Sequence, residues 1–206
     1  MEINVETIPF DVRYKLLTST IVPRPIALVS TIGLDGSTNL APFSYFNIVG
    51  HNPMALSFSV AGIKPDRFDK DTFVNISRIE KSEFVINIVN ENMVVQMAKT
   101  AAPFEYGVSE FDISGFVKEK SKTVKPFRVK EAPVSFECET FKIVEVGISK
   151  LIIGIVKHVY IDDELIDEKF RVNQTLLKAV GRMAGSNYCK STNLFVVDDE
   201  KFFPAS

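Results

Sequence analysis

The run from Leu151 to Ile161 restricts the possible folds of this chain more than any other segment. It is nearly continuous in β-branched residues, which favour strands because their side chains pack well on a pleated surface. In the preceding segment, residues 134–139, the apolar side chains of Val134, Phe136 and Cys138 alternate with polar ones, a period of two that is typical of strands. We therefore expect these two segments to pair as a meander, with residues 145–150 as their connection.

The first third of the chain contains further strand patterns and a strong turn signal. Ile26 to Ile32 is short and apolar, and the Asp35-Gly36 pair follows it, a combination that favours a hairpin turn. The return strand is expected over residues 38–41. From Met54 to Val60, large apolar residues alternate with small ones, which predicts another strand with small hydroxyl residues on its second face.

Helical spacing is confined to a few stretches, chiefly residues 11–20, 73–79 and 91–101. The second of these helices is expected to be capped by Asp71 or Thr72, because both residue types cap helices well; a polar connection, residues 62–70, precedes it. Many short strands with few helices predict a mainly β fold, a β-barrel with helical insertions. No repeat or linker divides the sequence, so residues 1–206 are expected to form a single domain.

Composition excludes several classes of function. With 46% hydrophobic residues the chain can bury a large core. Its 24 basic and 26 acidic residues are scattered, which gives no electrostatic footprint for nucleic acid. No stretch approaches the roughly 18 consecutive apolar residues that a membrane helix needs, and no basic segment leads into an apolar run at the N-terminus. We expect a cytoplasmic protein that binds neither nucleic acid nor membranes.

The common catalytic motifs are missing from the sequence. Cys138 and Cys189 form no metal-ligand or dithiol pattern, and Cys138 is expected to be a buried, inert thiol. His51 and His158 lie far apart, and the acidic groups 162–163 and 198–200 are most simply solvated turns. The sequence contains no Rossmann, P-loop or nucleophile-elbow signature. We therefore predict no catalytic acid, base or nucleophile and no metal site.

Lys70 and Thr72 form a group suited to an anionic ligand. A cation lies next to a hydroxyl and to the N–H groups that open a predicted helix, which is a favourable arrangement for a phosphate. The alternative is that Thr72 only caps this helix while Lys70 faces water. The residues alone leave both interpretations open.

The order of several motifs resembles that of flavin reductase-like, or flavoredoxin-type, proteins, which have an FMN-binding split β-barrel. The resemblance extends from about Pro23 to Tyr188, and the order and separation of the motifs make it specific. The motifs are residues 24–31 (RPIALVST), 39–46 (NLAPFSYF), 70–72 (KDT), 83–87 (EFVIN), 110–111 (EF) and 181–188 (GRMAGSNY).

This resemblance implies a six-stranded Greek-key split barrel, usually homodimeric, that holds FMN near the subunit interface. By position, Lys70 and Thr72 would hold the phosphate, while Ser30 and Thr31 would contact the flavin or its ribityl chain. The remaining implied contacts are Asn39 and Ser44 beside the isoalloxazine, the strand Ser57, Phe58, Ser59 and Val60 beneath the ring or the phosphate, and Arg182 and Tyr188 near the C-terminus.

The resemblance further implies an NAD(P)H:flavin oxidoreductase. NADH or NADPH would reduce the bound FMN, which would pass electrons to free flavin, a ferric complex or an electron-acceptor protein. A flavin carries this chemistry itself, so the protein needs no acid-base pair. The alternative is an FMN-binding electron carrier or flavin-binding protein without NAD(P)H turnover.

Overall fold

The computed structural model describes residues 1–61, 70–105 and 107–197, so residues 62–69 of the predicted connection 62–70 and the acidic group 198–200 lie outside the described residues. Its centre is a seven-stranded antiparallel sheet in the order β3-β2-β6-β9-β10-β5-β4, one strand more than expected. These strands are β2 (Ala27–Ile32), β3 (Thr38–Phe43), β4 (Phe46–His51), β5 (Met54–Val60), β6 (Glu83–Ile88), β9 (Val134–Val146) and β10 (Ser149–Ile161).

The two long strands β9 and β10 pair along almost their whole length, which confirms the predicted meander. β9 continues to Val146, well beyond the alternating segment that the sequence indicated. The register shifts between Ile153 and Gly154, and a Cβ atom at Gly154 would lie 2.3 Å from the ring of Phe84 on β6, the strand on the other side of β9. A side chain at this position would have no room, which explains the glycine within an otherwise β-branched strand.

The predicted hairpin near the N-terminus is also confirmed. β2 pairs with β3 from Ala27 opposite Phe43 to Ile32 opposite Thr38. Gly36 has a φ of 83° in the connecting turn, a conformation that glycine adopts without a steric penalty. β2 also pairs with β6, so it is central and buried on both faces.

Strand β4 has no counterpart in the sequence analysis. It pairs with β5 and forms one edge of the sheet, and β3 forms the other edge. These two edge strands follow each other in the chain and are joined by a corner at Ser44 and Tyr45. A backbone hydrogen bond of 2.8 Å from Ser59 N to Tyr45 O attaches this corner to β5. The curled sheet is therefore a split barrel.

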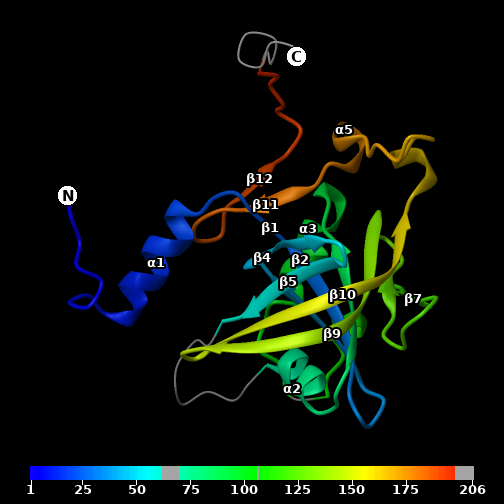
Figure 1. The fold of residues 1–206 in the computed structure, drawn as a ribbon, viewed down its shortest axis with the longest axis horizontal. Helices are drawn as coiled ribbons and strands as arrows, with labels where there is room; N and C mark the ends of the chain where they lie inside the picture. Colours follow the sequence, from blue (N-terminus) through cyan, green and yellow to red (C-terminus); the bar gives the residue numbers. More distant parts are fainter. Residues whose placement is uncertain (62–69, 106, 198–206) are drawn as a thin grey trace.

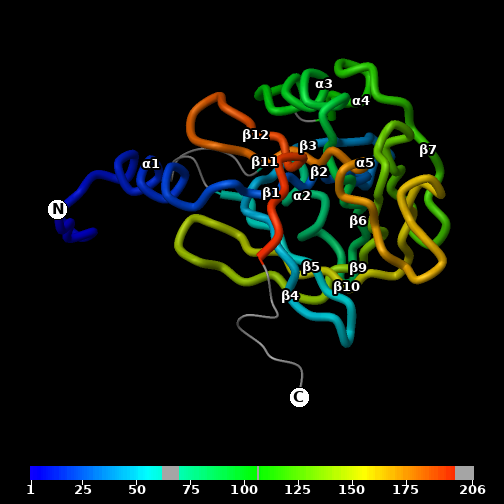
Figure 2. The backbone as a smooth tube through the Cα atoms, turned by 90° about the horizontal axis from the view of Figure 1, so that it is seen from above, coloured from blue at the N-terminus to red at the C-terminus, as the bar shows by residue number. Residues whose placement is uncertain are grey.

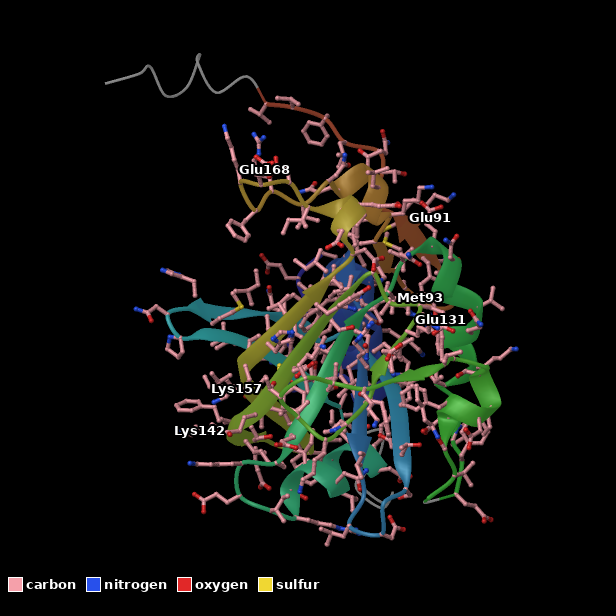
Figure 3. All side chains as sticks on the ribbon, turned by 90° about the vertical axis from the view of Figure 1, so that its right-hand side faces the viewer. Glu91, Met93, Glu131, Lys142, Lys157 and Glu168 are labelled. Carbon is pink, nitrogen blue, oxygen red and sulfur yellow. The ribbon has the colours of Figure 1, made fainter. Side chains whose placement is uncertain are left out.

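The barrel has two apolar cores. Inside it, Phe58 stacks edge-on against Phe84 at 5.5 Å between ring centroids, and Cys138 is buried beside them as expected. The second core lies between β2, β3 and the helices α3 (Val94–Lys99) and α4 (Glu110–Ser114). Met93 is buried in this second core, whereas Lys142 and Lys157 on the outer faces of β9 and β10 are exposed (Figure 3).

A small three-stranded sheet lies beside the barrel, and the N-terminal helix leads into its first strand. The sheet contains β1 (Arg24–Pro25), β11 (Val180–Arg182) and β12 (Tyr188–Lys190) in the order β1-β11-β12. Helix α1 (Phe10–Thr20) precedes β1 and extends away from the body of the molecule (Figures 1 and 2). The C-terminal motif, residues 181–188, thus begins in a strand, because Gly181 and Arg182 pair with Pro25 and Arg24.

Helix α2 (Asp71–Ser77) lies at one end of the barrel. The prediction that Asp71 or Thr72 caps this helix is wrong. The N-cap residue is Lys70 in an extended conformation, and no side chain caps the helix. Thr72 lies within the first turn with its hydroxyl bonded elsewhere. The remaining elements are β7 (Lys118–Glu119), β8 (Arg128–Val129), α5 (Gln174–Leu177) and the short 3-10 helices Glu91–Met93 and Asp163–Leu165. None of the described helices is long and apolar enough to cross a membrane.

Candidate functional site

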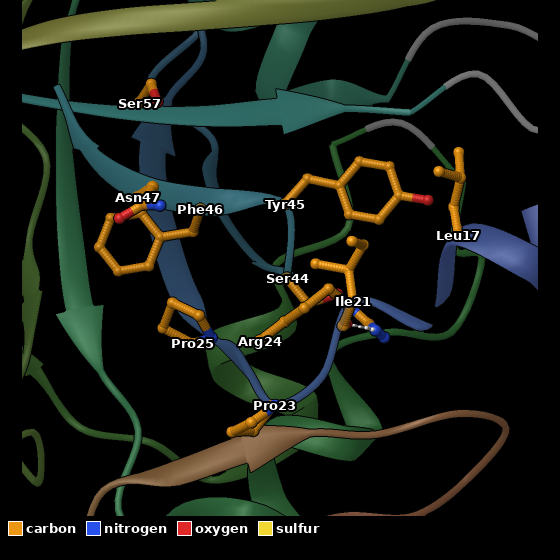
Figure 4. Close-up of a pocket in the computed structure, with 10 residues that line it drawn as sticks. All are labelled: Leu17, Ile21, Pro23, Arg24, Pro25, Ser44, Tyr45, Phe46, Asn47 and Ser57. Atoms are coloured by element: carbon orange, nitrogen blue, oxygen red, sulfur yellow. Dashed lines mark hydrogen bonds between the residues drawn. The ribbon is translucent and has the colours of Figure 1, made fainter. Parts of the chain in front are cut away.

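An open pocket of about 400 Å³ lies where α1, β1 and the β3–β4 corner meet (Figure 4). Leu17 of α1 and Ile21, which follows the helix, form one side, and Tyr45 and Phe46 come from the corner and from β4. The full lining is Leu17, Ile21, Pro23, Arg24, Pro25, Ser44, Tyr45, Phe46, Asn47 and Ser57. Rings and aliphatic side chains predominate, with a few hydroxyl and amide groups between them, which suits a planar organic ligand.

No carboxylate, histidine or cysteine belongs to the described lining of this pocket. Burial raises the pKa of Tyr45 above its usual range, so its phenol stays protonated at neutral pH. The pocket therefore offers hydrogen-bond donors and apolar contacts, but no group that titrates near neutrality. Such a lining can bind a ligand, yet it supplies no acid-base chemistry of its own.

Arg24 supplies a cation to the lining of this pocket. This residue is only 6% exposed, and its hydrogen bonds connect three segments of the chain. Its Nη1 donates to the carbonyl oxygens of Thr18 and Ile21, each at 2.7 Å. Nη2 donates to the carbonyl oxygen of Met183 at 3.2 Å, and Nε approaches Ser44 Oγ at 3.4 Å. One guanidinium thus joins the end of α1, the β11–β12 turn and the β3–β4 corner.

Beside α2, a buried polar network links two strands and two helices. Asn39 Oδ1 accepts hydrogen bonds from Thr72 Oγ1 at 2.7 Å and from Thr31 Oγ1 at 3.2 Å. Its Nδ2 donates to both carboxylate oxygens of Glu110, at 3.1 and 3.0 Å. Asn75 Nδ2 donates to Thr31 Oγ1 at 3.0 Å. The sequence-predicted residues Thr31, Asn39 and Thr72 therefore lie together, bonded to one another.

Lys70 lies between this network and the barrel core. Its Nζ is 5.3 Å from the centroid of the Phe43 ring, a cation–π contact. Burial lowers the pKa of Lys70, and the negative charge of Glu110 partly opposes that shift. Among the described residues, Lys70 forms no salt bridge. A partly buried ammonium with no salt bridge to any described carboxylate is a favourable position for an anionic ligand.

The other predicted residues fall into three groups. Ser44 and Ser57 line the pocket. Ser30 is buried and donates to the carbonyl oxygen of Phe127 at 2.5 Å, while Phe58 and Val60 belong to the barrel core and Ser59 is half-buried on β5. Arg182 and Tyr188 face each other across β11 and β12, with the guanidinium 4.6 Å from the ring centroid. Arg182 also donates to the carbonyl oxygen of Gly185.

Two residues with no predicted role, Arg24 and Glu110, are central to the geometry. Both belong to motifs that carry the family resemblance, and each is a charged residue that is only 6% exposed. Glu110 also accepts a hydrogen bond from Leu40 N at 2.9 Å. Burial raises the pKa of Glu110, and the hydrogen bond from Leu40 opposes this effect. The sequence signal that was available for Arg24 is a charged residue directly before a proline, at the start of an expected strand region.

The antiparallel sheet is curled, and its two edge strands, β3 and β4, meet at the corner beside an apolar pocket. This arrangement defines a protein of the split-barrel class. Residues 19–184 match the family model of the flavin reductase like domain. This match covers most of the chain, and the protein belongs to the flavin reductase-like family. The predicted fold class and family are thereby confirmed.

Similar proteins span nearly the whole chain. An uncharacterized protein of Aquifex aeolicus is 40% identical over 191 residues, which cover 93% of this chain and 96% of that protein. The structure of nitrilotriacetate monooxygenase component B from Bacillus cereus has a TM-score of 0.90 at 33% identity and covers 96% of this chain and 98% of its own. The 2-nitrobenzoate 2-nitroreductase of Pseudomonas fluorescens has a TM-score of 0.88 at 32% identity, with both chains fully covered. The family and these neighbours indicate a flavin-related oxidoreductase with a flavin cofactor.

Proposed function

We propose that this protein is an FMN-dependent NAD(P)H oxidoreductase that passes electrons to free flavin, a ferric complex or a protein partner. The observation that carries this proposal is the combination of an open, ring-lined pocket with Lys70, an ammonium that has no salt bridge among the described residues. A flavin mononucleotide has the two matching parts, a planar apolar ring system and a phosphate. Phe43 connects the two regions, because its ring contacts Lys70 and its chain neighbour Ser44 lines the pocket.

In this proposal, Lys70 holds the phosphate, while Ser44 and Ser57 offer hydroxyls to the ring system. Phe58, Ser59 and Val60 belong to the strand that forms the floor, and Ser30, Thr31, Asn39 and Thr72 support it from the buried side. Arg182 and Tyr188 lie on β11 and β12 of the small sheet, and β11 pairs with β1, whose residues Arg24 and Pro25 line the pocket. The flavin would supply the redox chemistry, which agrees with a described pocket lining that holds no carboxylate, histidine or cysteine.

A homodimer is part of the same proposal. Phe10, Tyr14, Leu17 and Ile21 recur every three or four residues along α1 and its end, and each is at least half exposed. This spacing puts them on one side of the helix, which extends away from the barrel (Figure 1). An exposed apolar stripe on a projecting helix favours association, and we propose a second copy of this chain as its partner. Sedimentation equilibrium of the purified protein and of Tyr14→Glu tests this point, because a monomeric parent protein would refute it.

The decisive experiment is spectroscopic. The purified protein is saturated with FMN, freed of excess ligand, and its visible spectrum is followed anaerobically during addition of NADH or NADPH. Bleaching at a rate above that of free FMN is the expected result. A protein that ignores added FMN would contradict the cofactor assignment. Bleaching by dithionite but by neither nicotinamide nucleotide would favour the second function, an electron carrier without NAD(P)H turnover.

A further inference from the structure

Glu110 determines the orientation of the Asn39 side chain. A buried carboxylate only accepts hydrogen bonds, and the two oxygens of Glu110 lie 3.1 and 3.0 Å from Asn39 Nδ2. The amide nitrogen must therefore face α4. Asn39 Oδ1 then faces the opposite way, toward Thr31 and Thr72, and both hydroxyls donate to it. One carboxylate fixes the donor direction of the whole network.

Asn39 in turn fixes the start of α2. Thr72 is fully buried, and its hydroxyl donates to Asn39 Oδ1 at 2.7 Å, across 33 residues of chain. No side chain caps this helix, so the usual local means of fixing a helix start is missing here. The long-range bond from Thr72 to β3 replaces it. Lys70 is two residues before Thr72, and its position relative to Phe43 on the same strand depends on this attachment.

We propose that Glu110 is a positioning residue for the phosphate of the cofactor: through Asn39 and Thr72 it holds Lys70 where the phosphate binds. This inference rests on the proposed FMN function, but Glu110, Asn39 and Thr72 do not belong to the described lining of the ring pocket. The inference therefore predicts an effect that differs between two flavins. Disturbing Glu110 should weaken binding of FMN and leave binding of riboflavin unchanged, because riboflavin lacks the phosphate.

The first test is Glu110→Gln, which keeps the shape of the side chain but replaces one acceptor oxygen with an NH₂ group. That NH₂ group would take the place of one of the two oxygens that accept from Asn39 Nδ2, so one hydrogen bond would become a donor–donor contact and Asn39 would be held less firmly. We expect the Kd for FMN to rise at least about tenfold, while the Kd for riboflavin stays within about twofold. Both constants are measured by flavin fluorescence quenching.

The second test restores the pairing in the opposite sense. In the double variant Glu110→Gln and Asn39→Asp, the NH₂ group at position 110 donates to the new carboxylate at position 39. The other oxygen of that carboxylate still accepts from Thr31 and Thr72, and the amide oxygen at position 110 still accepts from Leu40 N. The expected result is recovery of most of the FMN affinity, which a merely space-filling role of Glu110 would not produce.

Glu137→Gln is the matched control. Glu137 is also a buried carboxylate with three hydrogen bonds, from Lys122 N, Thr123 N and Thr123 Oγ1 at 2.6–2.7 Å, but it is bonded to a different loop. Its ratio of FMN to riboflavin affinity should equal that of the parent protein. If Glu110→Gln does not fold, Thr72→Ser and Thr72→Val replace it, and only the valine variant should lose FMN selectivity.

The possible failures are distinguishable. An unchanged affinity ratio in Glu110→Gln, or an equal loss for both flavins, overturns the positioning role while the proposed function stands. A parent protein that binds FMN and riboflavin equally overturns the phosphate contact itself. A parent protein that binds neither flavin overturns the proposed function, and the inference with it.

Discussion

Arg24 and Thr18 are joined by a 2.7 Å hydrogen bond from the guanidinium Nη1 to a carbonyl oxygen in the last turn of α1. A cation at this end of a helix is favourable, because the last carbonyl groups carry the negative end of the helix dipole. The bond also fixes the side of the pocket that α1 provides, since Leu17 and Ile21 lie in the same turn. The pocket therefore depends on a residue of β1 to keep its helical wall in place.

Replacing Arg24 with Gln should release this wall. Hydrogen bonds to charged groups contribute about 1.5–3 kcal/mol each, so we expect the helix to detach, the protein to lose stability and flavin affinity to fall. Limited proteolysis measures the detachment, with faster cleavage near residue 20 as the expected result. Arg13→Gln is the control, because Arg13 is exposed on the same helix and its side chain donates, among the described residues, only to the carbonyl oxygen of Ile8. Equal cleavage rates in both variants would contradict the role of Arg24.

Lys70→Ala should weaken FMN binding by about 10- to 100-fold, the loss expected for a charge-assisted contact to phosphate. Folding should change much less, because Lys70 forms no salt bridge within the described part of the chain whose loss could destabilise the fold. Lys150→Ala is a matched control: Lys150 also lies over a ring, that of Phe73 at 5.6 Å, but it is paired with Glu145. Isothermal titration of FMN into both variants separates them, and retention of parental affinity in Lys70→Ala would disprove the phosphate contact.

The affinity for FMN should also depend on pH at the alkaline end. Burial lowers the pKa of Lys70 below the value of about 10.4 for an exposed lysine. The ammonium is charged below this pKa and neutral above it, so FMN affinity should be high at neutral pH and fall as the pH rises through it. Lys70→Arg should abolish the fall, because a guanidinium stays charged in this range. Titrations between pH 7 and pH 10.5 test both statements, provided the far-UV circular dichroism is constant.

Glu137 should contribute to acid sensitivity. Burial disfavours its charged form, but hydrogen bonds from Thr123 and Lys122 outweigh burial and lower the pKa of the carboxyl. A group whose pKa is lower in the folded state stabilises the protein above its unfolded pKa of about 4.3. That contribution is lost as the pH falls from this value through the folded pKa. Urea unfolding of the parent protein and Glu137→Gln between pH 7 and pH 3 should give a shallower acid decline for the variant.

Gly154→Ala should destabilise the barrel core. A methyl group at this position would lie 2.3 Å from Phe84 Cζ and 3.2 Å from Cys138 Cβ, and overpacking of this kind costs about 1–3 kcal/mol. In a chain of this length each kcal/mol lowers Tm by roughly 2–4 °C. Gly50→Ala on β4 is the control, because the nearest atom to its new methyl group would be 3.6 Å away. Equal melting temperatures for the two variants would contradict this packing argument.

Strands with a regular pattern were predictable from the sequence, and those that depend on tertiary position were not. The β2–β3 hairpin and the β9–β10 pair follow from alternation, β-branching and a turn signal, which are local properties. Strand β4 escaped prediction because it is an edge strand in which Asn47, Ile48 and Val49 are all exposed. Its side chains do not alternate between a core and solvent, so the sequence carries no period of two.

The candidate site was predictable where the family motifs name a residue, but its connections were not. The predicted cap at Asp71 or Thr72 was wrong because Asn39, a residue distant in the chain, competes for the hydroxyl of Thr72. The role of Glu110 depends on a contact across 71 residues, and that of Arg24 on a contact to Met183 across 159. Contacts between residues so far apart in the chain leave no local sequence pattern from which they could be predicted. The individual roles of the predicted cofactor residues stay predictions until binding is measured.

The corner at Ser44 and Tyr45 has a consequence for how far the barrel can open. It is the covalent link between the two edges of the sheet, and it also lines the pocket. At this corner, the gap between the edge strands can therefore widen only as far as two residues of chain can extend. The same length limits how far the pocket can open. A circularly permuted chain with its ends at this corner would keep every strand pair and lose this tether, so the width of the binding mouth and the stability of the barrel could be varied separately.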